Sequence, residues 1–184
     1  MKRLALFVEG KGDAAAVSII VKRLLTEQNA WDCLFPDSRP FVVGEVGRLL
    51  KDDCRQWRRW LGAAAKHGDL GAVLLVLDGD IEKLQGKAFC AASLARALAT
   101  ESERAGGGRL FSVAAVFACR EFESWLIAGV ESLAGKNLED GRPGIEAGTR
   151  APEGDLESAP RDAKGWLRQM MERGTGYSPA RDQA

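Results

Sequence analysis

Histidine and cysteine, which supply many metal-ligating and nucleophilic side chains, are scarce in this sequence. One histidine, His67, occurs in 184 residues, which excludes a His-rich zinc site and makes any Ser-His-Asp scheme depend on that residue. The four cysteines stand far apart and form no C-x-x-C motif. We therefore expect reduced thiols rather than a disulfide framework or a thiolate metal site.

An excess of one charge and long apolar runs are also missing. The 26 Lys and Arg residues balance 26 Asp and Glu residues, so any nucleic-acid contact must come from a local patch rather than from the whole chain. No apolar run approaches the ~20 residues that cross a bilayer, and residues 4–8 are too short for a signal-peptide core. These absences predict a cytoplasmic protein without a membrane partner.

Apolar runs alternate with helical stripes along most of the chain. Strands are expected at residues 4–8, 41–46, 72–77 and 111–119, and each is followed by a stretch with helical periodicity. The first of these four helices is expected to begin near Asp13. The other three are expected to cover about 49–66, 88–104 and 121–133. This order predicts an α/β fold, Rossmann-like, with a parallel four-stranded sheet and helices on both faces.

The pattern changes beyond Gly135. Residues 136–159 are rich in Gly, Pro and Glu without periodicity, which predicts a mobile loop. A short helix is expected at 160–173, followed by turn residues around Tyr177. We therefore expect an α/β domain over 1–135, with residues 136–184 forming a C-terminal helical appendage that packs on the same domain.

Carboxylates follow two of the buried strands. Glu9 ends the first strand, and Asp78 and Asp80 end the third, with Gly79 between them. In open α/β folds ligands bind beyond the carboxyl ends of the strands, and crowded carboxylates suit a hard cation such as Mg²⁺. The alternative is that each acid caps a helix or pairs with a basic side chain.

These acids carry a resemblance to a known family. Glu9-Gly10 after the first strand, with Asp78-x-Asp80 after a later one, resembles the TOPRIM domain of topoisomerases, primases and OLD-family nucleases. The resemblance covers residues 1–129 and implies a TOPRIM-like fold in which Glu9 acts in acid/base chemistry or metal binding. It implies that Asp78 and Asp80 hold Mg²⁺, and that Glu82 corresponds to a third acid found in some members.

A second segment narrows the resemblance. Residues 120–128, Arg-Glu-Phe-Glu-Ser-Trp-Leu-Ile-Ala, are similar to the Glu-x-Glu-x-Trp-Leu segment of uncharacterised prokaryotic TOPRIM-like proteins. Members are often encoded beside an ATPase and are suspected of roles in anti-phage defence. The resemblance implies that Glu121 is a further metal ligand and that Glu123 lies near the site. Position alone equally allows both acids to complement a helix dipole.

The sequence departs from those relatives after the first glycine. They usually have Thr-Glu or Ser-Glu there, whereas this chain has Lys11-Gly12-Asp13. Asp13 could replace the glutamate as an acid or simply be the helix N-cap. Residues 10–15 also match the dinucleotide pattern G-x-G-x-x-A, but no acid ends the second strand at the expected spacing.

A basic stripe is expected on the second helix. Arg55, Arg59 and Lys66 fall on one side of it, away from Trp57 and Leu61. The stripe could contact phosphates, or it could be a solvated face over a Trp-packed core.

The cluster of acids predicts a bound Mg²⁺ or Mn²⁺, and the resemblance implies that this ion serves hydrolysis of phosphodiester bonds in nucleic acid, with DNA favoured over RNA. Asp78 and Asp80 would hold the metal, and Glu9 would bind it or move a proton. Lys11 would stabilise the charged phosphate. The alternatives are a non-catalytic subunit that docks on a partner ATPase, and a nucleotide-binding module.

Overall fold

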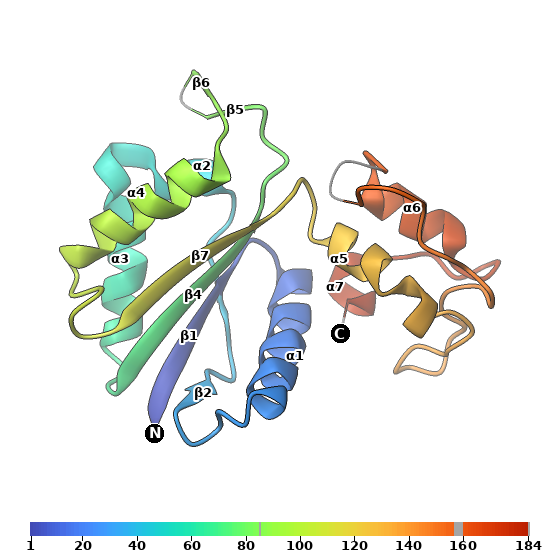
Figure 1. The fold of residues 1–184 in the computed structure, drawn as a ribbon, viewed down its shortest axis with the longest axis horizontal. Helices are drawn as coiled ribbons and strands as arrows, with labels where there is room; N and C mark the ends of the chain where they lie inside the picture. Colours follow the sequence, from blue (N-terminus) through green and yellow to red (C-terminus); the bar gives the residue numbers. More distant parts are fainter. Residues whose placement is uncertain (85, 157–159, 184) are drawn as a thin grey trace.

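In the computed structural model, which describes residues 1–84, 86–156 and 160–183, five strands form a parallel sheet (Figure 1). Its strand order is β2-β1-β4-β7, and β3 also pairs with β1. The strands are β1 (Lys2–Val8), β2 (Leu34–Pro36), β3 (Phe41–Val42), β4 (Leu70–Asp78) and β7 (Ser112–Ala118). The uninterrupted apolar runs of β1 and β4 occupy the centre, where strands are buried on both faces.

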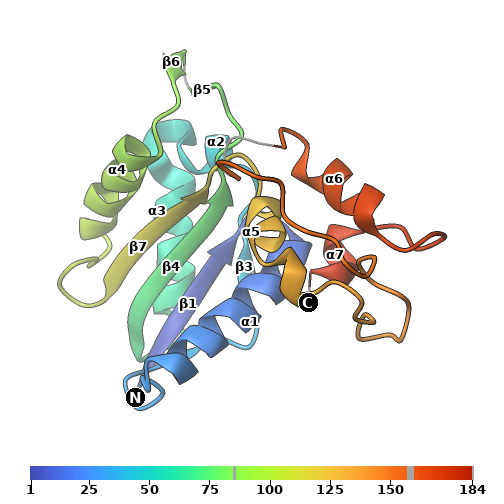
Figure 2. The same ribbon diagram turned by 45° about the vertical axis from the view of Figure 1, so that its right-hand side comes forward.

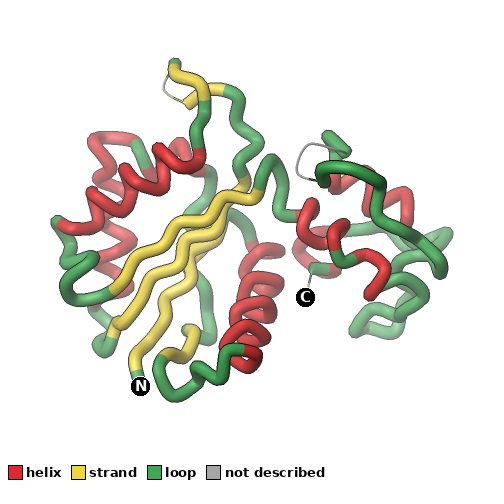
Figure 3. The backbone as a smooth tube through the Cα atoms, in the orientation of Figure 1, coloured by secondary structure: helices red, strands yellow, loops and turns green. Residues whose placement is uncertain are grey.

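The register brings the carboxyl ends of the central strands to one edge. Val8 of β1 pairs with Val76 of β4, and Asp78 pairs with Ala118 of β7. The chain therefore leaves all three strands at the same edge of the sheet, which Figure 3 shows in yellow. A side chain that follows β1 can reach one that follows β4 only because of this alignment.

Helices cover both faces of the sheet. They are α1 (Lys11–Glu27), α2 (Val46–Leu49), α3 (Lys51–Ala65) and α4 (Ala91–Glu103). One core cluster packs α2, α3 and α4 on one face, and a second packs α1 on the other (Figures 1 and 2). Trp57 of α3 is fully buried, and its indole N–H donates to Leu98 O and Ser102 Oγ of α4. The predicted parallel α/β sheet with helices on both faces is confirmed.

The predicted count of four strands is wrong. The segment expected as one strand at 41–46 contributes only β3, and β2 forms before it, so β1 has two short neighbours. Pro36 and Pro40 flank the gap between them, and proline has no amide hydrogen to donate to a strand ladder. A small antiparallel pair, β5 (Lys83–Leu84) and β6 (Lys87–Ala88), was also not expected.

Two predicted helices are interrupted. The helix expected at 49–66 is interrupted near the start of α3 at residues 52–54, which have left-handed backbone angles. The short α2 lies mostly before the expected helix and begins at Val46, which was expected to end a strand. The helix expected at 121–133 is reduced to α5 (Glu123–Ala128), after which Gly129 leads into a single 3-10 turn at Val130–Ser132. Glycine lowers helix stability, which accounts for the second break.

The C-terminal segment has a hydrophobic cluster of its own. It contains α6 (Ala163–Met170) and α7 (Pro179–Asp182), and the cluster reaches back to Ile127 in α5. The segment expected as a mobile loop includes the bridge Ile145↔Met171, and Ile145 is buried. Residues 157–159 of that predicted loop lie outside the described residues. The domain division at residue 135 stays a prediction.

Helix α7 packs directly on α1. A Cβ atom on Gly12 would lie 2.4 Å from Gln183 Oε1 and 2.7 Å from the backbone of Pro179, so only glycine permits this approach. The C-terminal segment is thereby held beside the start of α1 (Figure 2). In the part of the chain that the structure describes, no helix has the length and apolar character to cross a membrane.

Candidate functional site

Glu9 lies where β1 ends, against the backbone of the neighbouring strand. Its Oε2 accepts a hydrogen bond from the Asp78 amide at 3.3 Å. Burial raises the pKa of Glu9, the Asp78 amide partly opposes this, and the charges of Asp80 and Asp13 raise it further. Glu9 and the start of the Asp78-x-Asp80 turn are therefore adjacent, as the sequence predicted.

Asp78 is the last residue of β4, and only 15% of its side chain is exposed. Its Oδ1 accepts a hydrogen bond from the Phe122 amide at 2.8 Å. Burial raises the pKa of Asp78 from 3.8 to about 7, even though the Phe122 amide and the nearby ammonium of Lys164 lower it. Because this pKa lies near neutral pH, a cation bound beside Asp78 would favour its charged form, and Asp78 would otherwise be partly protonated.

Gly79 lets the chain turn sharply after Asp78. Its amide donates to Ala118 O at 2.8 Å, and a Cβ atom there would lie 2.7 Å from the same oxygen. The close approach to the end of β7 therefore requires glycine. Beyond it, Asp80 is exposed and lines a cavity.

That cavity has a volume of about 440 Å³ and lies beyond the carboxyl ends of β4 and β7. Its charged lining combines acids and arginines: Asp80, Glu82, Glu121, Arg120 and Arg161. Arg120 has φ of 69°, in the left-handed region that non-glycine residues seldom adopt. Strained backbone of this kind is concentrated at functional sites, and here it falls directly after β7.

Lys164 of α6 reaches the same edge of the sheet from the C-terminal segment. Its Nζ lies 3.1 Å from Glu121 Oε1, 3.5 Å from Glu123 Oε2 and 3.8 Å from Asp78 Oδ2. Partial burial lowers the pKa of Lys164, but the attraction of these carboxylates outweighs it and the pKa is raised. A cation of the chain itself thus lies among acids that were predicted to bind a metal.

Glu121 is occupied on both oxygens. Oε1 contacts the Lys164 ammonium, and Oε2 accepts hydrogen bonds from the amides of Ala163 at 2.9 Å and Lys164 at 3.3 Å. The carboxylate therefore fastens the start of α6 to the end of β7. It precedes α5, so the alternative of complementing the dipole of its own helix concerns Glu123 only.

Glu123 is buried, with 1% of its surface exposed. Its Oε1 accepts hydrogen bonds from the Tyr177 hydroxyl at 3.3 Å and from Gln183 Nε2 at 3.0 Å. Burial raises the pKa of both Glu123 and Tyr177. The predicted additional site residue thus lies inside the protein, where it joins α5 to the C-terminal segment.

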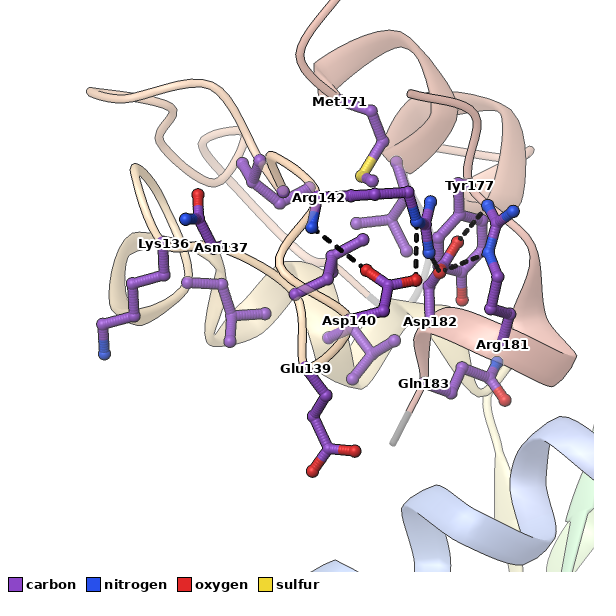
Figure 4. Close-up of a pocket in the computed structure, with 16 residues that line it drawn as sticks. Lys136, Asn137, Glu139, Asp140, Arg142, Met171, Tyr177, Arg181, Asp182 and Gln183 are labelled. Carbon is purple, nitrogen blue, oxygen red and sulfur yellow. Dashed lines mark hydrogen bonds and ion pairs between the residues drawn. The ribbon is translucent and has the colours of Figure 1, made fainter. Parts of the chain in front are cut away.

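Tyr177 and Gln183 also line a cavity of about 390 Å³ inside the C-terminal segment (Figure 4). At its rim the side chains of Arg142 and Arg181 both contact Asp182, at 2.7 and 2.8 Å. Partial burial raises the pKa of Asp182, but hydrogen bonds from the two arginines and the Ser178 amide outweigh it and lower the pKa to about 2. The pair between Arg142 and Asp182 holds α7 in the position from which Gln183 reaches Glu123, whereas Arg181 and Asp182 both belong to α7.

The start of α1 differs from one of the predicted alternatives. Gly10 is the N-cap, and Asp13 is the third residue of the helix, where its Oδ2 accepts the Gly10 amide at 2.8 Å. The interpretation of Asp13 as N-cap is therefore wrong, and its role is the reciprocal bond of a capping box.

Lys11 is exposed at the first position of α1. The close approach that Gly12 permits is made by Pro179 and Gln183 of the C-terminal segment, so the glycine has a packing role of its own.

The predicted basic stripe is only partly assembled. Arg55 and Arg59 line a cavity beside α3, whereas Lys66 follows α3 as its C-cap and is not among the residues that line this cavity. Two further cations, Arg48 and Lys51, line the same cavity.

The donor chemistry at the strand ends fits a hard cation. In residues 1–84, 86–156 and 160–183, no group of three or more His, Cys, Asp or Glu side chains is arranged to hold a metal ion as it stands. Mg²⁺ is commonly bound through one or two carboxylates and several waters, and the available donors near Glu9, Asp78 and Asp80 are carboxylate oxygens. They fit Mg²⁺ or Mn²⁺ better than the softer zinc, which prefers sulfur and imidazole.

Sequence reasoning missed Lys164 and Arg161. Both belong to the C-terminal segment, far along the chain from the strand ends that they approach. Neither stands in a motif, and a lysine on a short amphipathic helix is ordinarily solvated. The only sequence signal was the cluster of carboxylates itself, since partly buried acids need a cation from some source.

Comparisons with known proteins identify a family without an assigned function. The family described as "Domain of unknown function (DUF4276)" matches residues 8–183. No curated protein and no solved structure matches the chain.

Proposed function

The chain belongs to the DUF4276 family, and we propose that it is a TOPRIM-like, Mg²⁺-dependent hydrolase of phosphodiester bonds in nucleic acid. The observation that carries this proposal is the 440 Å³ cavity at the carboxyl ends of β4 and β7. Three acids, Asp80, Glu82 and Glu121, line it together with Arg120 and Arg161, whose guanidinium groups suit phosphate oxygens.

Asp78 and Asp80 would hold the ion, and Glu9 is close enough to Asp78 to share it. A bound Mg²⁺ would polarise a phosphate oxygen and lower the pKa of a coordinated water. Asp78 is kept in place for this task by the Phe122 amide, and Gly79 sets the direction in which Asp80 leaves the strand.

Glu9 is the candidate for moving the proton of the attacking water. Burial raises its pKa, and a general base works best when its pKa lies near the operating pH. Arg120, Arg161 and Lys11 would stabilise the charge on the phosphate.

A second candidate function follows from Lys164. Its ammonium lies within 4 Å of three acids at this edge of the sheet. A TOPRIM-like fold that no longer binds a metal ion would need such a cation to neutralise these acids. The chain would then be a non-catalytic TOPRIM-like subunit that binds a partner ATPase. The proposed context for either function is anti-phage defence.

The deciding experiment incubates the purified chain with plasmid, single-stranded DNA and RNA, in Mg²⁺, Mn²⁺ or EDTA. Each reaction is run alone and with any ATPase that is encoded beside the gene. Metal-dependent cutting is expected, and it should be lost when Asp78→Asn and Asp80→Asn are combined. The matched control combines Glu103→Gln and Glu139→Gln, which removes the same charge from exposed positions.

Two outcomes oppose the proposal. Cutting that persists in the Asp78→Asn, Asp80→Asn variant would remove the site assignment. Absence of cutting under every condition, together with stable binding to the ATPase, would support the non-catalytic subunit.

Metal binding is measured separately from activity by thermal melting. A ligand that binds only the folded state raises the melting temperature as its concentration rises. Mg²⁺ should therefore raise the melting temperature of the wild type and of the exposed-charge control. It should leave that of the Asp78→Asn, Asp80→Asn variant unchanged.

A further inference from the structure

The cavity beside α3 has an unusual charge for a chain whose net charge is zero. Its volume is about 790 Å³, and it is lined by four cations and one carboxylate: Arg48, Lys51, Arg55, Arg59 and Asp52. All four cations belong to α2 and α3 and are exposed. The local excess of positive charge therefore faces solvent in one hollow.

None of these four cations forms an ion pair with a described acidic residue. Within the part of the chain that the structure describes, ion pairs involve Arg3, Arg58, Arg104, Arg142, Arg181 and Lys164, but none of the four. On the same helix, Arg58 pairs with Glu101 across to α4. Four cations around a hollow that holds a single carboxylate repel each other, and an external polyanion would relieve that repulsion.

An aromatic ring lies among the cations. Trp60 lines the cavity and is half-buried, with its ring packed edge-on against Phe41 at a centroid distance of 6.0 Å. A groove that combines cations with an aromatic side chain suits a single strand, since phosphates meet the cations and an unpaired base can contact the ring. A duplex keeps its bases stacked inside and offers none to Trp60.

The cavity is continuous with the edge of the sheet that carries the acids. Val42 and Val43 form part of its wall, and Val42 pairs with Val8 of β1. The Val43 amide donates to Val8 O at 2.9 Å, and Glu9 is the next residue after Val8. A single-stranded nucleic acid bound in the cavity could therefore run along the carboxyl ends of β3, β1 and β4 to Glu9 and Asp78.

We propose that the cavity lined by Arg48, Lys51, Arg55, Arg59 and Trp60 binds the phosphate backbone of a single-stranded nucleic acid. This inference rests on the proposed function in naming the substrate of the acidic site, but binding itself needs no metal. The cations position the strand through its phosphates, and such contacts are independent of base sequence.

The test measures binding by fluorescence anisotropy in EDTA, with a labelled oligonucleotide of about 20 nucleotides and with the corresponding duplex. The variant combines Arg55→Gln and Arg59→Gln, and the control combines Lys22→Gln and Arg23→Gln on exposed positions of α1. Both remove two positive charges from a helix surface, where substitutions usually change stability little. Thermal melting of each variant verifies folding.

The wild type and the α1 control should bind the single strand more tightly than the duplex. The α3 variant should bind about tenfold more weakly at about 50 mM salt. The slope of log K against log salt should fall by about 1.4, because each phosphate that is no longer neutralised lowers it by about 0.7. Equal weakening in both variants, preference for the duplex, or no binding at about 50 mM salt would overturn the inference.

Failure of this inference can be told apart from failure of the proposed function. The Asp78→Asn, Asp80→Asn variant should retain single-strand binding in EDTA, because it leaves the cavity beside α3 intact. If the α3 variant loses binding but the wild type shows no metal-dependent cutting, only the proposed hydrolase activity is contradicted. Cutting by a wild type whose affinity does not depend on Arg55 and Arg59 would remove only the binding site.

Discussion

Lys164 Nζ lies 3.8 Å from Asp78 Oδ2, so the C-terminal helix α6 supplies a cation to the end of the central strand β4. The same ammonium contacts Glu121 and Glu123. In the proposed hydrolase, Lys164 and Mg²⁺ would compete for Asp78. The three carboxylates are stabilised by a side chain of the protein whenever the ion is absent.

Replacing Lys164 with methionine should expose this competition. The substitution keeps most of the side-chain volume and removes the charge, which leaves three poorly solvated carboxylates without their cation. In EDTA we expect a decrease of about 1–3 kcal/mol in the free energy of unfolding. Mg²⁺ should restore stability, and the Mg²⁺-induced rise in melting temperature should exceed that of the wild type.

The matched control is Lys22→Met, an exposed lysine on α1. It should leave both the melting temperature and its response to Mg²⁺ close to those of the wild type. An equal response to Mg²⁺ in wild type and Lys164→Met would show that the lysine and the ion do not share Asp78.

The raised pKa of Asp78 predicts a dependence of stability on pH. The pKa is about 7 in the folded protein and 3.8 ordinarily, so between these values the folded state holds a proton that the unfolded state has released. The contribution of Asp78 therefore lowers the free energy of unfolding as pH rises from about 4 to about 7. Asp78→Asn removes this contribution and keeps an oxygen for the Phe122 amide.

Melting in EDTA at about pH 5 and about pH 8 checks the sign of this effect. The asparagine variant should be more stable than the wild type by a larger margin at about pH 8 than at about pH 5, because the wild type loses stability until the pH passes the folded pKa of about 7. An equal difference at both pH values would contradict a raised pKa. The pKa of Asp182 is about 2, so its carboxylate is already fully charged above about pH 4 and does not change stability between about pH 5 and about pH 8.

Gly79→Ala should disrupt the turn between the two aspartates. Its Cβ would lie 2.7 Å from Ala118 O, so β4 and β7 must separate at their ends, and we expect a decrease of about 1–3 kcal/mol in the free energy of unfolding. Gly62→Ala is the control, because it lies inside α3 with no atom within 4 Å of the added Cβ. Alanine there should stabilise the helix by about 0.5–1 kcal/mol.

Urea unfolding of the two variants measures both effects. A Gly79→Ala protein as stable as the wild type would show that the end of β7 can move without cost. The same variant should also lose the response of the melting temperature to Mg²⁺, because Asp78 and Asp80 would no longer keep their relative positions.

The sequence by itself determined the parallel α/β arrangement and the convergence of Glu9 with Asp78. Both follow from local patterns, since uninterrupted apolar runs at β1 and β4 predict central parallel strands and the acids directly follow them. The position of the turn at Asp78-Gly79-Asp80 was readable for the same reason. The division of the second strand into β2 and β3 was not predicted. It depends on hydrogen bonds to β1, in which Pro36 and Pro40 have no amide hydrogen to donate.

Only the tertiary structure decided which charges meet. Lys164 and Arg161 reach the acids because α6 packs on α5, which follows β7, and Glu123 is buried beside Tyr177 and Gln183. Arg48 and Lys51 join Arg55 and Arg59 because the chain bends between α2 and α3. A charged side chain carries no periodic signal of its own, so its partner depends on the packing of distant segments.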